Sequence, residues 1–205
     1  MQLFAARLDE DLRKIEALSK SVGRRVLLKS KTDNLVDDIM LTGSCNVRLA
    51  LKYPTVPSRQ YPKKVQKTTD VVVKLLSRYP LVEPIAEITT PIFHPNVYAS
   101  GKICLGTKWL PSEGLDLVIK RIIQIITFDD TILNDASVAN RHALNWYRGA
   151  IKRDPSAFPT EVFEIIEPQS AIPVSWSDVP SEVSATGGAP EKPAAPKKMQ
   201  FRTSS

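Results

Sequence analysis

Apolar residues recur every three or four positions over the first 22 residues of the chain. This spacing places them along one side of a helix, while most basic residues of the segment lie on the other side. An amphipathic helix is therefore predicted from residue 4 to residue 22, with Gly23 at its end. Its apolar positions are Phe4, Leu8, Leu12, Ile15, Leu18 and Val22.

Runs of β-branched residues follow, separated by prolines. Between residues 45 and 52 apolar side chains alternate with other residues, which is typical of a strand with one buried face. Because no helical pattern stands between these runs, we expect successive strands to pair as an antiparallel meander. The predicted strands span residues 26–30, 45–52, 70–76 and 85–89.

The period changes in the second half of the chain. Residues 115–126 are too densely apolar for a surface helix, so they predict a central helix packed under the sheet. After a polar break, Asn134 or Asp135 is expected to cap a further helix that runs to about residue 152. Residues 161–166 fit either a short helix or a strand. This order of elements predicts an α+β fold.

The composition shifts beyond residue 166. Proline, alanine, serine and lysine become frequent and large apolar residues become sparse. Such a segment cannot offset its ordering entropy by burial. We therefore expect a folded domain over residues 1–166 and a flexible tail over residues 167–205.

The 205-residue chain has a formal net charge of +6. Its basic residues are scattered along the sequence, so we expect no nucleic-acid partner. Charged residues interrupt the longest apolar stretch, so we also expect no membrane span. The two cysteines, Cys45 and Cys104, do not make a disulfide framework. We expect free thiols in a cytoplasmic protein, with Cys45 inside the sheet.

Candidate chemistry surrounds the second cysteine. Cys104 stands between Ile103 and Leu105, and Asn96 precedes it in the sequence His-Pro-Asn. A thioester exchange needs a thiolate nucleophile and a donor that stabilises the oxyanion. Cys104 can supply the thiolate. The Asn96 amide can serve either the oxyanion or the loop that bears the cysteine.

Three further residues are expected to support this loop. Pro95 fixes the chain before Asn96, Gly101 permits a tight return, and His94 is expected to brace the loop by a hydrogen bond. The other histidine, His142, has no evident link to Cys104. A thiol without a paired base favours transfer of an activated acyl group over cleavage of an amide. No metal and no cofactor is predicted.

These segments resemble those of ubiquitin-conjugating enzymes over about residues 1–165. The matching motifs are the Tyr-Pro element of residues 78–84, the strand exit and His-Pro-Asn of residues 89–96, the Gly-Lys-Ile-Cys-Leu of residues 101–105, and Trp109 with Pro111. The order of predicted elements also resembles that family. The combination is more specific than any one of its parts.

The resemblance implies a transferase. Cys104 would carry ubiquitin or a ubiquitin-like protein as a thioester, received from an activating enzyme and passed to a lysine of a target protein. Asn96 would support attack on the thioester, and Trp109 would pack the active-site loop. The activating enzyme would contact Arg7, Arg13 and Lys14 on the first helix. A ligase, where one is used, would contact Leu81 and Pro111 on two loops.

The chain also departs from the family pattern. Tyr-Pro-Lys-Lys at residues 61–64 stands where a Tyr-x-Gly-Gly turn is usual, and Asp129-Asp130 replaces an Asp-Pro-Asn-Pro stretch. An acidic or serine residue there helps to deprotonate the lysine in the family, so Asp129 and Asp130 are candidates for this role. The departures suggest a divergent branch, and one hypothesis is a bacterial relative from an antiphage defence operon.

Two other classes of function remain open from the sequence. A catalytically silent module of the same fold would bind a ubiquitin-like protein without turnover, but such variants usually lack the cysteine that this chain keeps. A redox-active thiol protein needs a resolving cysteine, and Cys45 is expected in the core.

Overall fold

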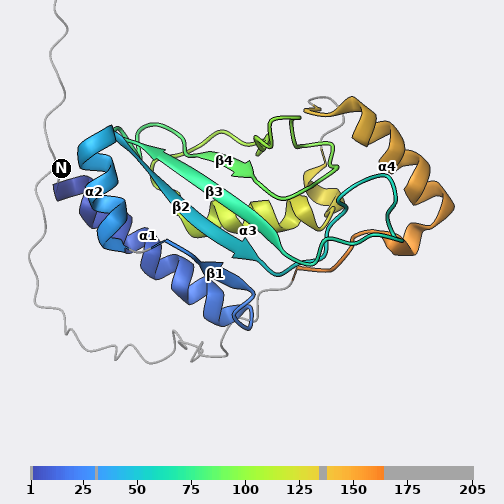
Figure 1. The fold of residues 1–205 in the computed structure, drawn as a ribbon, viewed down its shortest axis with the longest axis horizontal. Helices are drawn as coiled ribbons and strands as arrows, with labels where there is room; N and C mark the ends of the chain where they lie inside the picture. Colours follow the sequence, from blue (N-terminus) through green and yellow to red (C-terminus); the bar gives the residue numbers. More distant parts are fainter. Residues whose placement is uncertain (1, 31, 134–137, 164–205) are drawn as a thin grey trace, which may run out of the picture. The chain divides into compact units, whose positions relative to one another are not determined.

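Four strands and four α-helices, with two short 3₁₀-helices, form the described part of the chain (Figure 1). This computed structural model describes residues 2–30, 32–133 and 138–163. The elements are α1 (Gln2–Ser21), β1 (Val26–Leu28), α2 (Thr32–Thr42), β2 (Ser44–Leu51), β3 (Thr69–Leu76), β4 (Ile85–Ile88), α3 (Leu115–Ile126), η1 (Asp130–Ile132), α4 (Arg141–Arg153) and η2 (Pro155–Ala157).

The strands pair antiparallel in the order β1-β2-β3-β4, which confirms the predicted meander and the α+β class. Val47 of β2 lies opposite Val73 of β3, and Val73 lies opposite Ala86 of β4. All three are buried. This register therefore aligns apolar side chains on one face of the sheet, and a shift by one residue would expose them.

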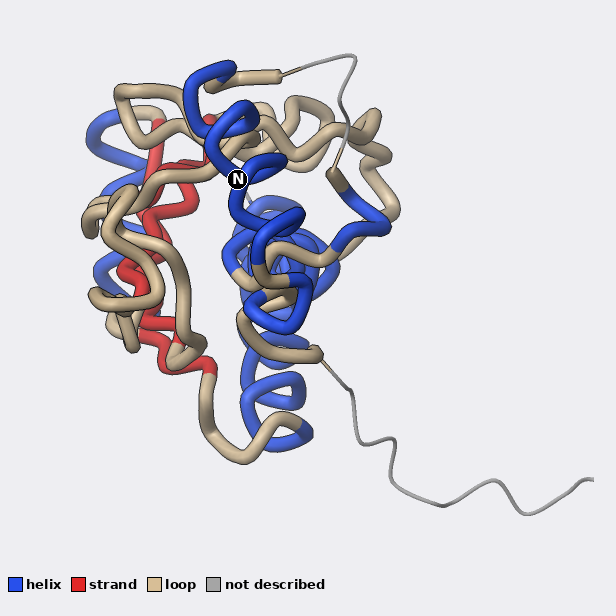
Figure 2. The backbone as a smooth tube through the Cα atoms, turned by 90° about the vertical axis from the view of Figure 1, so that its right-hand side faces the viewer, coloured by secondary structure: helices blue, strands red, loops and turns tan. Residues whose placement is uncertain are grey.

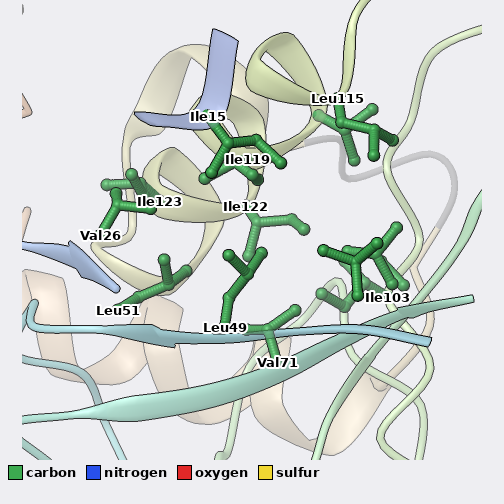
Figure 3. Packing of buried hydrophobic residues seen from close by; sticks show 14 of the residues in the cluster. Ile15, Val26, Leu49, Leu51, Val71, Ile103, Leu115, Ile119, Ile122 and Ile123 are labelled. Carbon is green, nitrogen blue, oxygen red and sulfur yellow. The ribbon is translucent and has the colours of Figure 1, made fainter. Parts of the chain in front are cut away.

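Helices α1 and α3 cover that face. Figure 3 shows Ile15 of α1 with Ile119 and Ile122 of α3 above Leu49 and Val71 of the sheet. Figure 2 shows the strands as one layer with α-helices beside it. Both helices were predicted, and the apolar positions that predicted them are buried. Full burial of one such side chain contributes roughly 1.5–3 kcal/mol.

Helix α2 was not predicted, so the expectation that no helix separates the strands is wrong between β1 and β2. Leu35 of α2 is buried, and Ile39 one turn later packs against the same core. A helix that shows only a short apolar stripe gives a weak periodic signal.

Helix α4 begins later than predicted. Its N-cap is Asn140, whose side-chain oxygen accepts a hydrogen bond from the Ala143 N–H at 3.0 Å. The expected caps, Asn134 and Asp135, lie outside the described residues, and the predicted start is wrong. All three side chains suit an N-cap, so residue type alone could not choose between them.

The predictions for residues 161–205 can be compared with the structure only in small part. Residues 161–163 form neither a helix nor a strand. The last residues of the undecided segment 161–166, and the predicted tail 167–205, lie outside the described residues. Among the helices that are described, none is long and apolar enough to cross a membrane.

Candidate active site

Asn96 and Cys104 face each other across a short hairpin. The Cys104 N–H donates to the Asn96 carbonyl at 2.8 Å, and the Tyr98 N–H donates to the Lys102 carbonyl at 2.9 Å. Between these bonds Val97 and Ile103 form a bridge, and both side chains are buried. The backbone thus holds the two candidate catalytic residues opposite each other.

Gly101 closes this hairpin against β4. Its φ is +88°, and a Cβ atom built on it would lie 2.3 Å from the Ile88 carbonyl oxygen. The approach is close because the Ile88 N–H donates to the Gly101 carbonyl at 2.9 Å. Positive φ and this lack of space both require glycine. The predicted tight return is therefore present.

Asn96 is 3% exposed, and its side-chain Nδ2 donates to the Cys104 carbonyl oxygen at 3.4 Å. In the free protein the amide therefore holds the loop that bears the cysteine, which is one of the two roles that the sequence left open. The same amide lies beside Cys104, whose sulfur would carry the acyl group on which an oxyanion develops.

His94 is fully buried and braces the turn. Its Nδ1 accepts a hydrogen bond from the Asn96 N–H at 3.0 Å, which places the proton of the neutral ring on Nε2. Burial lowers the pKa of His94 to about 3, and the nearby Ile125 carbonyl offsets only part of this effect. Nε2 has no hydrogen bond of normal geometry. A neutral, enclosed ring fits the predicted brace rather than a proton carrier.

Pro95 joins the hairpin to α4, because its carbonyl accepts from the Asn140 N–H at 2.9 Å. The residue that caps α4 thus also fixes the segment before Asn96. This link ties the position of α4 to the candidate site.

The Cys104 thiol is free and partly exposed in a groove of about 890 Å³. The hairpin forms one wall of this groove and α3 contributes another, through Leu117, Arg121 and Gln124. Arg121 donates to the Leu105 carbonyl at 3.0 Å, which holds the chain directly after the cysteine. Cys104 is thus one of the residues that line the groove.

The two candidate carboxylates do not line this groove. Asp129 caps η1, where Oδ1 accepts from the Thr131 N–H and hydroxyl at 3.0 and 2.6 Å. Its Oδ2 accepts from Gln124 Nε2 at 3.1 Å. Burial raises the pKa of Asp129, but the bonds from Thr131 and Gln124 outweigh it and hold the pKa below its usual value. Asp130 is exposed.

Trp109 packs where the resemblance implied. Its indole N–H donates to the Pro80 carbonyl at 2.7 Å, and its ring lies 5.9 Å from that of Tyr79. The loop after the cysteine is thereby fixed to the loop after β3. These two joined loops carry Leu81, which is 71% exposed, and Pro111, which is also exposed.

Arg7 is engaged within the chain. Its guanidinium donates to the Asp11 carboxylate at 2.8 Å, to the Pro111 carbonyl at 2.8 Å, and to the Glu113 carbonyl. Arg13 and Lys14 instead project from α1 into solvent, each paired with an acid one turn earlier. We therefore retain only Arg13 and Lys14 as candidates for contact with an activating enzyme.

Sequence reasoning missed three residues that organise the site: Asp11, Arg121 and Asn140. Asp11 is buried, and it also accepts from the Tyr79 hydroxyl at 2.5 Å and from the Leu115 N–H at 3.1 Å. A signal was available for Asp11, because an acid on the apolar stripe of a helix requires partners. Arg121 and Asn140 form hydrogen bonds with residues that are distant in the sequence, and no local sequence pattern predicts such contacts.

Within the described residues, no group of three or more His, Cys, Asp or Glu side chains is placed to hold a metal ion. The chemistry available is that of a cysteine thiol that lines a groove, with the Asn96 amide bound to the backbone of the same residue.

A sequence model of the ubiquitin-conjugating enzyme family matches residues 46–162, more than half of the chain. The chain belongs to the ubiquitin-conjugating enzyme family. The match includes nearly all of β2, the strands β3 and β4, the hairpin with Asn96 and Cys104, and both α3 and α4, whereas α1, β1 and α2 precede it.

Curated relatives agree with this assignment. A ubiquitin-conjugating enzyme E2 2 of Candida albicans is 32% identical over 107 residues, which are 49% of this chain and 50% of the relative. An African swine fever virus ubiquitin-conjugating enzyme E2 is 27% identical over 101 residues, 43% of this chain and 45% of the relative. The chain thus spans about half the length of these relatives.

Two solved structures are also similar. Human ubiquitin-conjugating enzyme E2 G1 has a TM-score of 0.41 and 20% identity, covering 57% of this chain and 90% of that one. S. cerevisiae Ubc12 has a TM-score of 0.49 and 17% identity, covering 72% and 74%. The family assignment rests on the sequence match instead.

Proposed function

We propose that this protein carries ubiquitin or a ubiquitin-like protein as a thioester on Cys104 and transfers it to a lysine of a target protein. The observation that supports this most strongly is the hairpin that sets the partly exposed Cys104 opposite the Asn96 amide. Membership of the family supports the same proposal.

The chemistry proceeds by two acyl transfers. In the first, the Cys104 sulfur bonds to the modifier's terminal carbonyl carbon, the thioester to the activating enzyme breaks, and the proton of Cys104 passes to the departing thiolate. In the second, a lysine nitrogen bonds to that carbon and Cys104 leaves as a thiolate. The nitrogen releases its extra proton to a base or to water. No further reactant is needed once the acyl group arrives activated.

Asn96 is proposed to donate to the oxyanion in the second step, after the amide turns from the Cys104 carbonyl. Loss of one such donor typically costs about 2.7–4 kcal/mol of transition-state stabilisation. Asn96→Ala should therefore slow transfer to lysine more than it slows loading of Cys104.

Asp129 and Asp130 are proposed to assist the incoming lysine. Because the pKa of Asp129 is held low, it would attract the ammonium group as a fixed charge rather than accept its proton. Asp130 is exposed and free of that cap, so it is the better candidate for the base.

The partner surfaces are proposals of the same kind. Arg13 and Lys14 would meet the activating enzyme. Leu81 and Pro111, together with Leu110, which is 51% exposed, would offer an apolar surface to a ligase. The contact between Trp109 and Pro80 supports a shared surface, because it holds the two loops together.

The cellular setting is proposed on narrower grounds. Two free cysteines suit the cytoplasm. The hypothesis of a bacterial defence operon has only the departures from the family pattern as support. A neighbouring gene for an activating enzyme would strengthen it, and an isolated gene would count against it.

Mixing the protein with activating enzyme, ATP and modifier tests the proposal. We expect an adduct that thiols remove, and Cys104→Ser should give an ester that survives them. If Cys104→Ala retained the full biological effect, the protein would be a binding module instead.

A further inference from the structure

The fold gathers basic side chains that are scattered in the sequence. Residues 52–68 and 138–153 hold nine of the 28 lysines and arginines and none of the 22 aspartates and glutamates. The first segment is the long loop between β2 and β3, and the second contains α4. The net charge of +6 is therefore unevenly distributed.

Contacts join the first segment to residues that follow the second one, and of these Phe158 packs against Trp146 and Tyr147 of α4. The Tyr61 hydroxyl donates to the Ala157 carbonyl at 2.9 Å, and the Tyr61 ring lies 5.4 Å from that of Phe158. Figure 1 shows the loop that leaves β2 beside the C-terminal end of α4. On the flank of the helix, the guanidinium of Arg59 lies over Phe93, whose ring lies 5.7 Å from that of Trp146.

Six exposed cations from the two segments define what we call the basic face. On α4, Arg141 and Lys152 lie about three helical turns apart on the side away from the buried Ala143 and Tyr147. Arg153 follows Trp146 by about two turns and so shares its flank, towards Arg59. The basic face consists of Arg59, Lys63, Lys64, Arg141, Lys152 and Arg153.

These cations differ from those of α1 in their pairing. Arg13, Lys14 and Lys20 each contact an acid one turn earlier, so α1 largely neutralises itself. In the part of the chain that is described, no ion pair within 4.0 Å involves a residue of the basic face. As far as the described residues go, the positive charge of the basic face is thus not neutralised by close ion pairs.

Local structure explains only part of this charge. Lys152 and Arg153 stand in the last turn of α4, where cations interact favourably with the helix dipole. Arg59, Lys63 and Lys64 lie on a loop and gain nothing from a helix end. Among the described residues, none of these three forms an ion pair within 4.0 Å, although the carboxylate of Asp154 lies near Tyr61 of the same loop.

The basic face begins beside the candidate active site. Asn140, which precedes Arg141, donates through its N–H to the Pro95 carbonyl. Pro95 adjoins Asn96, whose amide contacts Cys104. A partner that lies along α4 would therefore extend from the basic face towards the hairpin that bears the thiol.

We propose that the basic face docks an acidic segment of the protein that receives the modifier. The proposal rests on the transferase function proposed above. It assigns to this chain a preference for target lysines that are followed or preceded by several acidic residues.

A protein segment fits better than a nucleic acid. Single strands bind by stacking bases on aromatic rings. The rings near the basic face are already engaged: Phe93 with Arg59 and Trp146, and Trp146 and Tyr61 with Phe158. The basic face therefore recognises a partner by charge and not by stacking on aromatic rings.

Binding tests the proposal without any activating enzyme. The probes are a fluorescent peptide with one lysine and six glutamates, its glutamine analogue, and a 20-nucleotide thymidine strand, each titrated with the full chain. We expect salt-sensitive binding of the acidic peptide alone, and Lys63→Glu/Lys64→Glu should weaken it by at least about fivefold. The control Arg48→Glu/Lys74→Glu makes the same change in net charge on exposed positions of the sheet and should weaken it far less.

Several results would overturn the proposal. One is that the acidic peptide does not bind. Another is that the control variant weakens peptide binding as much as Lys63→Glu/Lys64→Glu does. A third is that the oligonucleotide binds more tightly than the peptide and the peptide cannot displace it. The last of them would assign the basic face to nucleic acid.

Transfer kinetics then separate docking from chemistry. The Lys63→Glu/Lys64→Glu variant should load Cys104 normally and discharge to free lysine at the wild-type rate, but discharge more slowly to the acidic peptide. If loading fails already in the wild type, the proposed function is at fault. If loading succeeds and the variant discharges equally well to both peptides, the docking proposal is wrong.

Discussion

Single residues set the geometry around the thiol. Gly101 lets the hairpin return against β4, Asn96 binds the backbone of Cys104, and His94 supports Asn96 from the protein interior. Each role depends on a particular backbone angle, atom or degree of burial. Substitutions at Gly101 and His94 should therefore change stability in ways that the same substitutions at Gly106 and His142 do not.

Gly101→Ala should lower the free energy of unfolding by at least about 2 kcal/mol, because alanine meets both a positive φ and the Ile88 carbonyl. Urea denaturation measures this loss. Gly106 provides a matched control, since its φ is +71° but nothing lies within 4 Å of an added Cβ. Equal losses for Gly101→Ala and Gly106→Ala would contradict the steric account of Gly101.

His94 should make stability depend on pH. Its pKa is lowered to about 3 in the folded protein, while the unfolded chain binds a proton near pH 6.5. The unfolded state therefore holds more protons between these values, and stability should fall as pH falls below 6.5, by up to about 1.4 kcal/mol per pH unit.

Denaturation at several pH values tests this with two variants. His94→Gln should lose the part of the pH dependence between 6.5 and 5, although it is less stable at pH 7. His142→Gln, at an exposed position of α4, should keep the wild-type slope. If His94→Gln retained the full slope, other groups would be responsible.

At the scale of elements, α1 holds the loops beside the site through Asp11. Its carboxylate accepts from Arg7 of the same helix, from Tyr79 of the loop after β3, and from the first N–H of α3. Burial and the bond to Asp11 raise the pKa of Tyr79, so its hydroxyl stays a donor. Three segments that are distant in sequence therefore meet at one buried carboxylate.

Asp11→Asn should destabilise the protein by about 3 kcal/mol, because it leaves Arg7 without its buried partner. Asp9→Asn is the control, since its exposed pair with Arg13 should contribute less than about 1 kcal/mol. Thermal or urea denaturation compares the two. Similar, small losses for both variants would mean that the Asp11 network does not hold the loops.

Which helices and strands could be predicted from the sequence depended on how often each repeats an apolar position. Strands β2 and β3 and helices α1 and α3 were predicted because each repeats an apolar position often enough to define a period. Helix α2 is too short for this, and the start of α4 depended on a choice among similar capping residues. Asn96, Gly101 and Cys104 were predicted from their motif. Arg121 and Asp11 were not, because their partners are fixed only by the tertiary fold.

For the whole molecule, the account depends on Cys104 being a reachable acyl carrier. Cys45 of β2 is buried in the core, and this burial raises its pKa to about 11, with a smaller effect from Asp38, whereas Cys104 is partly exposed and lines the groove. The two cysteines of the chain thus differ sharply in access. Only Cys104 should form the thioester.

Intact-protein mass spectrometry after loading, with and without dithiothreitol, tests this most directly. The account predicts one adduct, with the mass of the modifier less one water, that dithiothreitol removes. Cys45→Ala should load like the wild type, and Cys104→Ala should not load. An adduct that persists on Cys104→Ala, or no adduct on the wild type with an activating enzyme and modifier shown to be active together, would contradict the account.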